Sequence, residues 1–244
     1  MRMKTLGVIG GLGPMATAYF LQLVTQMTAA ETDQEHIEIL VHSRPGIPDR
    51  TGYILGRSSD SPLPDMIATG RELISQGAEI LAIPCITAHY FQRQLEEAVN
   101  APIINAVRET AVCLERAKVR KVGLMATDGT IESGLFQRAL SGSSLETIIP
   151  DKEHQAGVMH LIYQNVKAGL PVEYDLFEEI AGRLFAGGAE VVLLGCTELS
   201  LIKRDFELQP GFLDVMEVLA REAVLSCGRL KSKYMELITG RVKV

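Results

Sequence analysis

The chain contains no tryptophan, has only four cysteines, and has no apolar run approaching the ~20 residues of a membrane-spanning helix. Its first apolar stretch, residues 6–12, is too short and too rich in glycine for the apolar region of a signal peptide. The cysteines show none of the CxxC spacings typical of metal sites. We therefore expect a cytoplasmic protein with reduced thiols, no metal and no membrane partner.

The chain also lacks an excess of basic residues. Its 24 lysines and arginines are outnumbered by 30 aspartates and glutamates, which gives a net charge of −6. Such a chain offers no basic stripe, so we expect no nucleic-acid partner. A small anionic substrate stays open, because a few local cations outweigh a mild overall charge. With 47% hydrophobic residues in 244, the chain can build a substantial core in one large domain or two small ones.

The most informative feature of the sequence is a short motif that occurs twice. Residues 77–85 read GAEILAIPC and residues 188–196 read GAEVVLLGC. A glycine-bounded run rich in Ile, Val and Leu predicts a strand buried on both faces of a parallel sheet. The two runs end at Cys85 and Cys196, and threonine follows at Thr87 and Thr197. Since open α/β sheets bind ligands at the carboxyl ends of their strands, we expect one pseudo-symmetric site with a thiol from each half.

Strand and helix patterns alternate through both halves, which predicts an α/β fold of two pseudo-symmetric domains, each a mostly parallel sheet flanked by helices. Further strands are expected over 4–10, 37–42, 101–105, 120–126 and 146–149, and helices over 15–30, 64–76, 88–99, 133–141, 174–186 and 214–225. We expect the last helix to return to the first half. Residues 1–102 with 210–244 then form a discontinuous first domain, and residues 103–209 form the second. Residues 231–244 are expected to add a helix or strand.

Five segments resemble motifs of the aspartate/glutamate racemase superfamily, in the branch of cofactor-independent aspartate racemases and broad-specificity amino-acid racemases. They are residues 6–17 (LGVIGGLGPMAT), 48–51 (PDRT), 84–89 (PCITAH), 123–127 (GLMAT) and 194–199 (LGCTEL). The resemblance runs in order from about residue 4 to about residue 225. It implies an active site in the cleft between the domains, a two-base mechanism without pyridoxal phosphate or metal, and a homodimer.

One position departs from the motif of that superfamily. The first cysteine motif usually reads Pro-Cys-Asn-Thr-Ala-His, and its asparagine helps to hold the substrate, whereas this chain has Ile86 there. An apolar side chain cannot hydrogen-bond a carboxylate. Either other groups take over that contact or the substrate has a different shape.

Racemisation removes a proton from one face of Cα and returns one to the opposite face, which suits two opposed acid/base groups. Cys85 and Cys196 are the candidates, one starting as thiolate and the other as thiol. Each precedes a predicted helix, whose first N–H groups favour an anion. We expect Thr87 and Thr197 to cap those first turns or to contact the substrate carboxylate.

The resemblance also suggests substrate-binding and supporting residues. Thr127, Thr130 and the glycine loop around Gly11 are candidates for holding the carboxylate, where negative charge develops. Arg50 and Lys167 match cations that favour an acidic amino acid. We expect supporting roles for His89 and Glu198. Cys113 and Cys227 have no matching partner and are expected to fill the core.

Four other interpretations stay open. A cis–trans isomerase of the same superfamily would use one cysteine as a nucleophile on an alkene acid. A hydrolase or transferase would pair Cys85 with His89, four residues later. A binding protein would keep the fold without catalysis. The segment 11–16 also fits a loose dinucleotide fingerprint, although the acidic residue expected after the second strand is missing.

Overall fold

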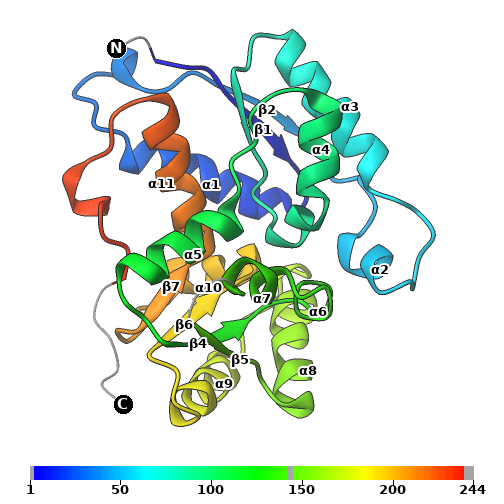
Figure 1. The fold of residues 1–244 in the computed structure, drawn as a ribbon, viewed down its shortest axis with the longest axis vertical. Coiled ribbons are helices and arrows are strands. Elements are labelled where there is room, and N and C mark those ends of the chain that lie inside the picture. Colours follow the sequence, from blue (N-terminus) through cyan, green and yellow to red (C-terminus); the bar gives the residue numbers. More distant parts are fainter. Residues whose placement is uncertain (1–2, 142–144, 239–244) are drawn as a thin grey trace.

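Two parallel sheets form the centre of the molecule (Figure 1). The computed structural model describes residues 3–141 and 145–238. The first sheet has the order β2 (Ile39–Ser43), β1 (Leu6–Gly10), β3 (Ile80–Ala82). The second has the order β5 (Glu146–Ile148), β4 (Lys121–Met125), β6 (Val191–Leu194), β7 (Phe212–Asp214). Every strand pair is parallel, so the predicted fold class is confirmed.

The two sheets are built on the same plan. β1 and β4 are central, and the strands that lead to the two cysteines, β3 and β6, pair with them. β7 continues the second sheet beside β6, whereas the first sheet has only an isolated parallel bridge between Leu81 and Ile103. The strand expected over 101–105 is therefore reduced to this bridge.

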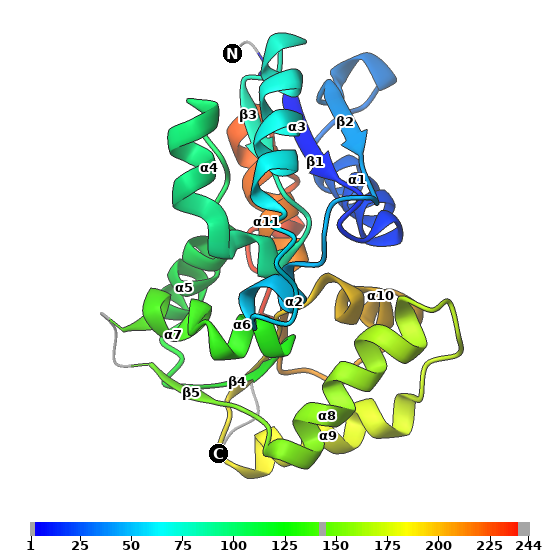
Figure 2. The same cartoon turned by 90° about the vertical axis from the view of Figure 1, so that its right-hand side faces the viewer.

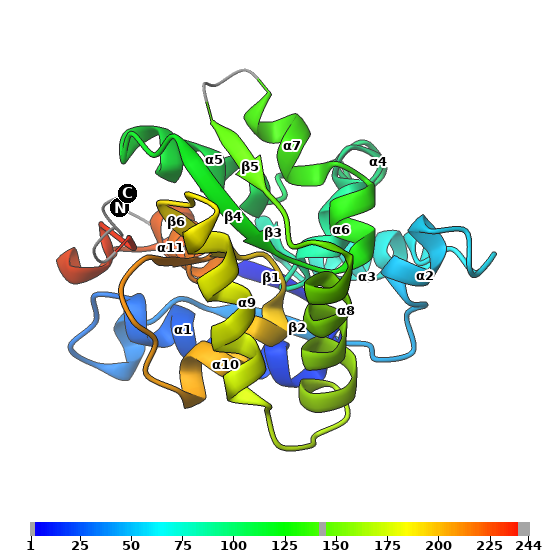
Figure 3. The ribbon, with the colours of Figure 1, turned by 90° about the horizontal axis from the view of Figure 1, so that it is seen from below.

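Helices cover both faces of each sheet, as the buried runs predicted. Alternate residues of β1 point to opposite faces. Leu6 and Val8 pack with α1 (Pro14–Met27) and α11 (Val215–Cys227), while Ile9 packs with α3 (Leu63–Ser75) and α4 (Gln92–Val99). In the second sheet, Val192 of β6 packs towards α8 (Lys152–His160) and α9 (Tyr174–Ala186). Figure 2 shows α3 and α4 beside the first sheet, and Figure 3 shows α8 and α9 side by side against the second.

The helices are α1 (Pro14–Met27), α2 (Arg50–Ile54), α3 (Leu63–Ser75), α4 (Gln92–Val99), α5 (Ala106–Arg116), α6 (Asp128–Glu132), α7 (Leu135–Leu140), α8 (Lys152–His160), α9 (Tyr174–Ala186), α10 (Thr197–Asp205) and α11 (Val215–Cys227). Short 3-10 helices span Asp33–Glu35, Ile86–Phe91 and Ser232–Tyr234, and a π-helix, η3, spans Leu161–Val166. Throughout residues 3–141 and 145–238, no helix combines the length and the apolarity that crossing a bilayer requires.

Several elements differ from the sequence prediction. Helices α5 and α8 and strand β7 were not predicted, whereas α10 is the helix expected after Cys196; α1 ends three residues early. In the tail, the described residues 231–238 contain only the 3-10 helix, and residues 239–244 lie outside the described part. Strand β7 belongs to the second sheet, so the chain leaves that sheet at Asp214. The division into domains at 102/103 and 209/210 stays a prediction.

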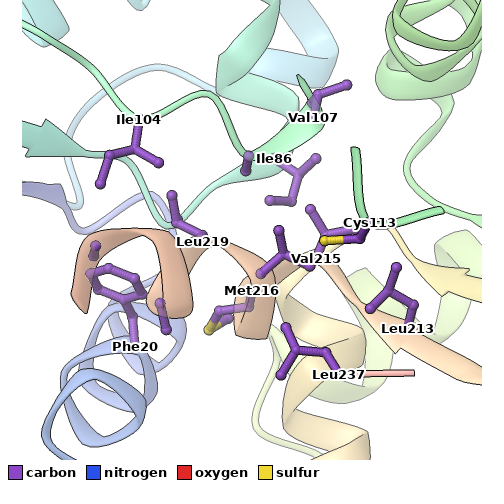
Figure 4. Packing of buried hydrophobic residues seen from close by; sticks show 14 of the residues in the cluster. Phe20, Ile86, Ile104, Val107, Cys113, Leu213, Val215, Met216, Leu219 and Leu237 are labelled. Carbon is purple, nitrogen blue, oxygen red and sulfur yellow. The ribbon is translucent and has the colours of Figure 1, made fainter. Parts of the chain in front are cut away.

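The core that joins the halves lies around α11. This helix packs against α1 and α5, and one continuous cluster takes residues from both sheets. Figure 4 shows Ile86 in this cluster beside Val107 and Val215. Cys113 and Cys227 are also buried in the cluster, as predicted.

Candidate functional site

Cys85 and Cys196 line one small cavity, here called the inner cavity. Cys85 follows β3 and Cys196 follows β6, and they are 6% and 5% exposed. The cavity has a volume of about 10 Å³, enough for about one water molecule. Its other lining residues come from both halves: Leu12, Asp49, Arg50, Thr51, Ile86, Thr87, Thr127, Tyr163, Lys167, Thr197 and Glu198. The fold thus brings the two matched strand ends to one place.

Cys196 is held as a neutral thiol. Its Sγ donates a hydrogen bond to Glu198 Oε2 at 2.8 Å. Burial, followed by the negative charge of Glu198, raises the pKa of Cys196 well above its usual range, and the nearby Lys167 only partly opposes this. The backbone N–H of Glu198 at the start of α10 lowers the pKa of Cys196, as expected, but burial and the Glu198 carboxylate outweigh it.

Lys167 and Glu198 form an ion pair beside this thiol, with 3.4 Å between Nζ and Oε1. The Lys167 side chain is 28% exposed, whereas that of Glu198 is 5% exposed. Burial lowers the pKa of Lys167, but its charge interactions, that with Glu198 first among them, outweigh burial and raise it. The ammonium group therefore stays charged next to both thiols.

Cys85 lies beside the buried guanidinium of Arg50. Burial lowers the pKa of Arg50, but its charge interaction and hydrogen bond with Cys85 outweigh burial and raise it. The same guanidinium donates to three backbone carbonyls, from Nη1 to Pro48 at 2.9 Å and Ile47 at 3.2 Å and from Nη2 to Leu12 at 2.9 Å. Arg50 thus both braces its loop and places a fixed positive charge at Cys85.

His89 does not contact the Cys85 thiol by a hydrogen bond. Its Nδ1 lies 3.1 Å from the backbone oxygen of Cys85, and the ring is 3% exposed. Burial lowers the pKa of His89. The residue supports the turn after β3, and this geometry does not favour the Cys85–His89 nucleophile–base pair.

Three buried threonine hydroxyls form a triangle between the halves. Thr87 Oγ1 lies 2.9 Å from Thr127 Oγ1 and 3.1 Å from Thr130 Oγ1, and the latter two are 3.1 Å apart. Thr87 and Thr127 line the inner cavity, whereas Thr130 stands behind them. Thr197 also lines the cavity and donates to Glu198 Oε2 at 3.3 Å. Neither Thr87 nor Thr197 is the N-cap residue of its helix, since the cysteines hold those positions.

A second, larger cavity adjoins the first and is here called the outer cavity. Its volume is about 450 Å³. It shares five lining residues with the inner cavity: Asp49, Arg50, Tyr163, Lys167 and Glu198. Its other lining residues are Gly11, Gly13, Pro14, Met15, Ala16, Pro45, Ile47, Val166 and Leu201. Gly11, a predicted substrate contact, lines the outer cavity, and its φ of +86° with Arg44 packed against it requires glycine there.

Sequence reasoning missed three residues of this region: Asp49, Thr51 and Tyr163. Asp49 and Thr51 stood in the quoted segment 48–51 without an assigned role; Asp49 caps α2 by accepting a bond from Gly52 N–H. Tyr163 lies in the π-helix η3, and its hydroxyl donates to Asp49 Oδ1 at 3.3 Å. No periodic pattern in the sequence predicts that π-helix.

No group of three or more histidine, cysteine, aspartate or glutamate side chains within the described ranges is arranged to hold a metal ion. The expectation of a reaction without metal or cofactor stays a prediction.

Comparison with known proteins agrees with this architecture. The family model of Asp/Glu/Hydantoin racemases matches residues 9–223. The broad specificity amino-acid racemase RacX of Bacillus subtilis is 23% identical over 231 residues, covering 90% of this chain and 96% of RacX. The Picrophilus torridus aspartate racemase structure is 29% identical with a TM-score of 0.82, covering 97% of this chain and all of that one. A glutamate racemase from Francisella tularensis in complex with D-glutamate, 17% identical, shares the fold at a TM-score of 0.65, with 91% and 80% covered. The chain belongs to the Asp/Glu/Hydantoin racemase family.

Proposed function

We propose that this protein racemises an amino acid without a cofactor: one of Cys85 and Cys196 removes the Cα proton, and the other donates a proton to the opposite face of Cα. The observation that carries the proposal is the single cavity lined by both thiols, each supplied by the matched strand end of its own half. The family membership supports the reaction class.

The surroundings of the two sulfur atoms suit opposite starting roles. We assign the role of base to Cys85, because the fixed charge of Arg50 lies beside it, and it removes the proton from the Cα face it meets. Cys196, protonated and bonded to Glu198, donates its proton to the other face. One proton leaves Cα for Cys85 and one reaches Cα from Cys196, so the product is the mirror image. The other enantiomer runs the same steps in reverse.

Between these steps, negative charge spreads onto the substrate carboxylate. The hydroxyls of Thr87 and Thr127 lie at the cavity wall, where each can donate to the carboxylate once the bond between them opens, and Thr130, 3.1 Å from both, can donate to one of them. Donors fixed before the reaction stabilise such charge most effectively. We assign these threonines, with Thr197, to carboxylate binding.

Ile86 cannot donate such a bond and packs into the core instead. The threonine hydroxyls therefore replace the contact that the motif's usual asparagine makes. Arg50 and Lys167 line both cavities and are the reason to propose an acidic substrate of the aspartate or glutamate type. A homodimer in the cytoplasm stays a prediction.

Substrate entry requires the inner cavity to widen, because it holds only about one water molecule. The contact between Tyr163 and Asp49 and the bond between Thr87 and Thr127 join the halves across it. We propose that these contacts open on entry and close over the substrate, which excludes water during proton transfer.

The test is proton exchange in heavy water with each pure enantiomer as substrate. Cys85→Ser and Cys196→Ser should each lower racemisation by roughly 10²–10⁴-fold, the usual worth of a positioned acid or base. In each variant, Cα proton exchange should be retained better for the enantiomer whose Cα proton faces the remaining cysteine. The matched control is Cys227→Ser, a buried cysteine that lines neither cavity and should leave racemisation unchanged. Wild-type racemisation in both active-site variants would refute the proposal.

A further inference from the structure

Tyr163 occupies the boundary between the inner and outer cavities. Of the five residues that line both, Asp49, Arg50, Lys167 and Glu198 are charged, and Tyr163 alone is uncharged and aromatic. Its ring is therefore the one bulky neutral group in the wall between the thiols and the larger space outside.

Both halves of the molecule hold this ring in place. The π-helix η3 carries it from the second half, and its hydroxyl donates to Asp49 Oδ1 of the first half at 3.3 Å. The Lys167 ammonium lies 5.0 Å from the ring centroid, within cation–π range. Burial raises the pKa of Tyr163 to about 12, so the hydroxyl keeps the proton that it donates. When these contacts are formed, as they are in this structure, the ring is part of the wall.

The two sides of this wall differ strongly in size and chemistry. The inner cavity measures about 10 Å³ and the outer about 450 Å³. Away from the shared residues, the outer cavity is mainly apolar, with Met15, Ile47, Val166 and Leu201 in its lining. Between a substrate whose Cα lies at the thiols and this space stand the residues that line both cavities, Tyr163 among them.

We propose that Tyr163 is a specificity-determining residue whose ring closes the inner cavity towards the outer one and limits the substrate to side chains of aspartate length. This inference rests on the proposed racemase function. Removing the ring joins the cavities, so longer side chains, including apolar ones, gain access to the thiols.

The test compares kcat/KM for racemisation of aspartate, glutamate and methionine in three proteins. Wild type should prefer aspartate. Tyr163→Ala should raise kcat/KM for glutamate and for methionine, each relative to kcat/KM for aspartate, by about tenfold or more. One methylene accommodated or rejected by a pocket changes kcat/KM by about 10–200-fold. The gain should appear as a lower KM for the long substrates. Tyr163→Phe keeps the ring and should keep the wild-type ratios, even if its kcat changes.

Tyr174→Ala is the matched control. Tyr174 lies in the same half, stacks on Phe206 at 4.5 Å between ring centroids, and lines neither cavity. Its loss should lower stability without changing the substrate ratios. If Tyr163→Ala does not fold, Tyr163→Leu removes most of the ring with a smaller change in packing.

Two results would overturn the inference while leaving the racemase proposal intact. One is a Tyr163→Ala or Tyr163→Leu protein that racemises aspartate but keeps the wild-type ratios of kcat/KM between the substrates. The other is a Tyr163→Phe protein whose ratios move as far as those of Tyr163→Ala, which would assign the effect to the hydroxyl. A wild-type protein that exchanges no Cα proton of any amino acid would instead refute the proposed function itself.

Discussion

Replacing Ile86 by asparagine restores the residue usual in the motif of this superfamily, and the structure predicts that the change harms the protein. Ile86 is 2% exposed and belongs to the cluster that joins the halves, where it lies beside Val107 and Val215 (Figure 4). It also borders the inner cavity. The variant therefore distinguishes a core position from a substrate-binding one.

The magnitude follows from burial. Removing a fully buried isoleucine side chain forfeits about 1.5–3 kcal/mol of transfer free energy. A buried amide without partners costs about 1–3 kcal/mol more. Ile86→Asn should thus lower the free energy of unfolding by about 3–5 kcal/mol. In a chain of this length, that corresponds to a Tm lower by roughly 10 °C. Ile86→Val should cost only about 1 kcal/mol.

Thermal and urea unfolding measure the stability, and racemisation kinetics measure the function. We expect Ile86→Asn to be less stable and no more active than wild type below its unfolding transition. An asparagine variant as stable as wild type and with higher kcat/KM would show that side chain 86 faces the substrate. That outcome would contradict the assignment of carboxylate binding to the threonines.

Two further predictions concern charge. Glu198→Gln removes the carboxylate that raises the Cys196 pKa, and Lys167→Met removes the cation that lowers it. The alkaline limb of the racemisation pH profile should move to lower pH in the first variant and to higher pH in the second; shifts in the same direction would contradict this arrangement. Asp214 is fully buried, and burial, followed by the charge of Glu217, raises its pKa from 3.8 to about 7. A raised carboxyl pKa stabilises the folded state below pH 4 and loses this stabilisation as pH rises to 7, by at most roughly 4 kcal/mol. In urea unfolding, the free energy of unfolding of Asp214→Asn should change less between pH 4 and pH 7 than that of wild type. An equal change in both proteins would refute the reasoning.

The sequence predicted the parts of the fold that have a strong local pattern. The runs that end at Cys85 and Cys196 are apolar throughout, which predicts strands covered on both faces, and β3 and β6 are such strands. Strand β7 was missed because it is only three residues long and runs directly into α11; its last residue, Asp214, was assigned to the predicted helix. Its pairing with β6 is a long-range contact that no local pattern encodes.

The site was predictable where a motif repeats and not where it depends on packing between the halves. Both cysteines and Glu198 stand in repeated or quoted motifs, and they share one cavity. Tyr163 carried no signal, because its position depends on a π-turn and on an acceptor from a distant loop. The raised pKa of Cys196 was also unpredictable, since burial is a property of the assembled structure.

The shared core around α11 limits how the two halves move. Apolar residues of α1, α5, α11 and both sheets form one cluster there, and separating the halves as rigid bodies would expose it to water. The contacts around the cavities are few and polar by comparison, as between Tyr163 and Asp49. We therefore expect the site to open through the contacts around the cavities, including the loop that leads into α2 and η3, while the shared core holds the halves together.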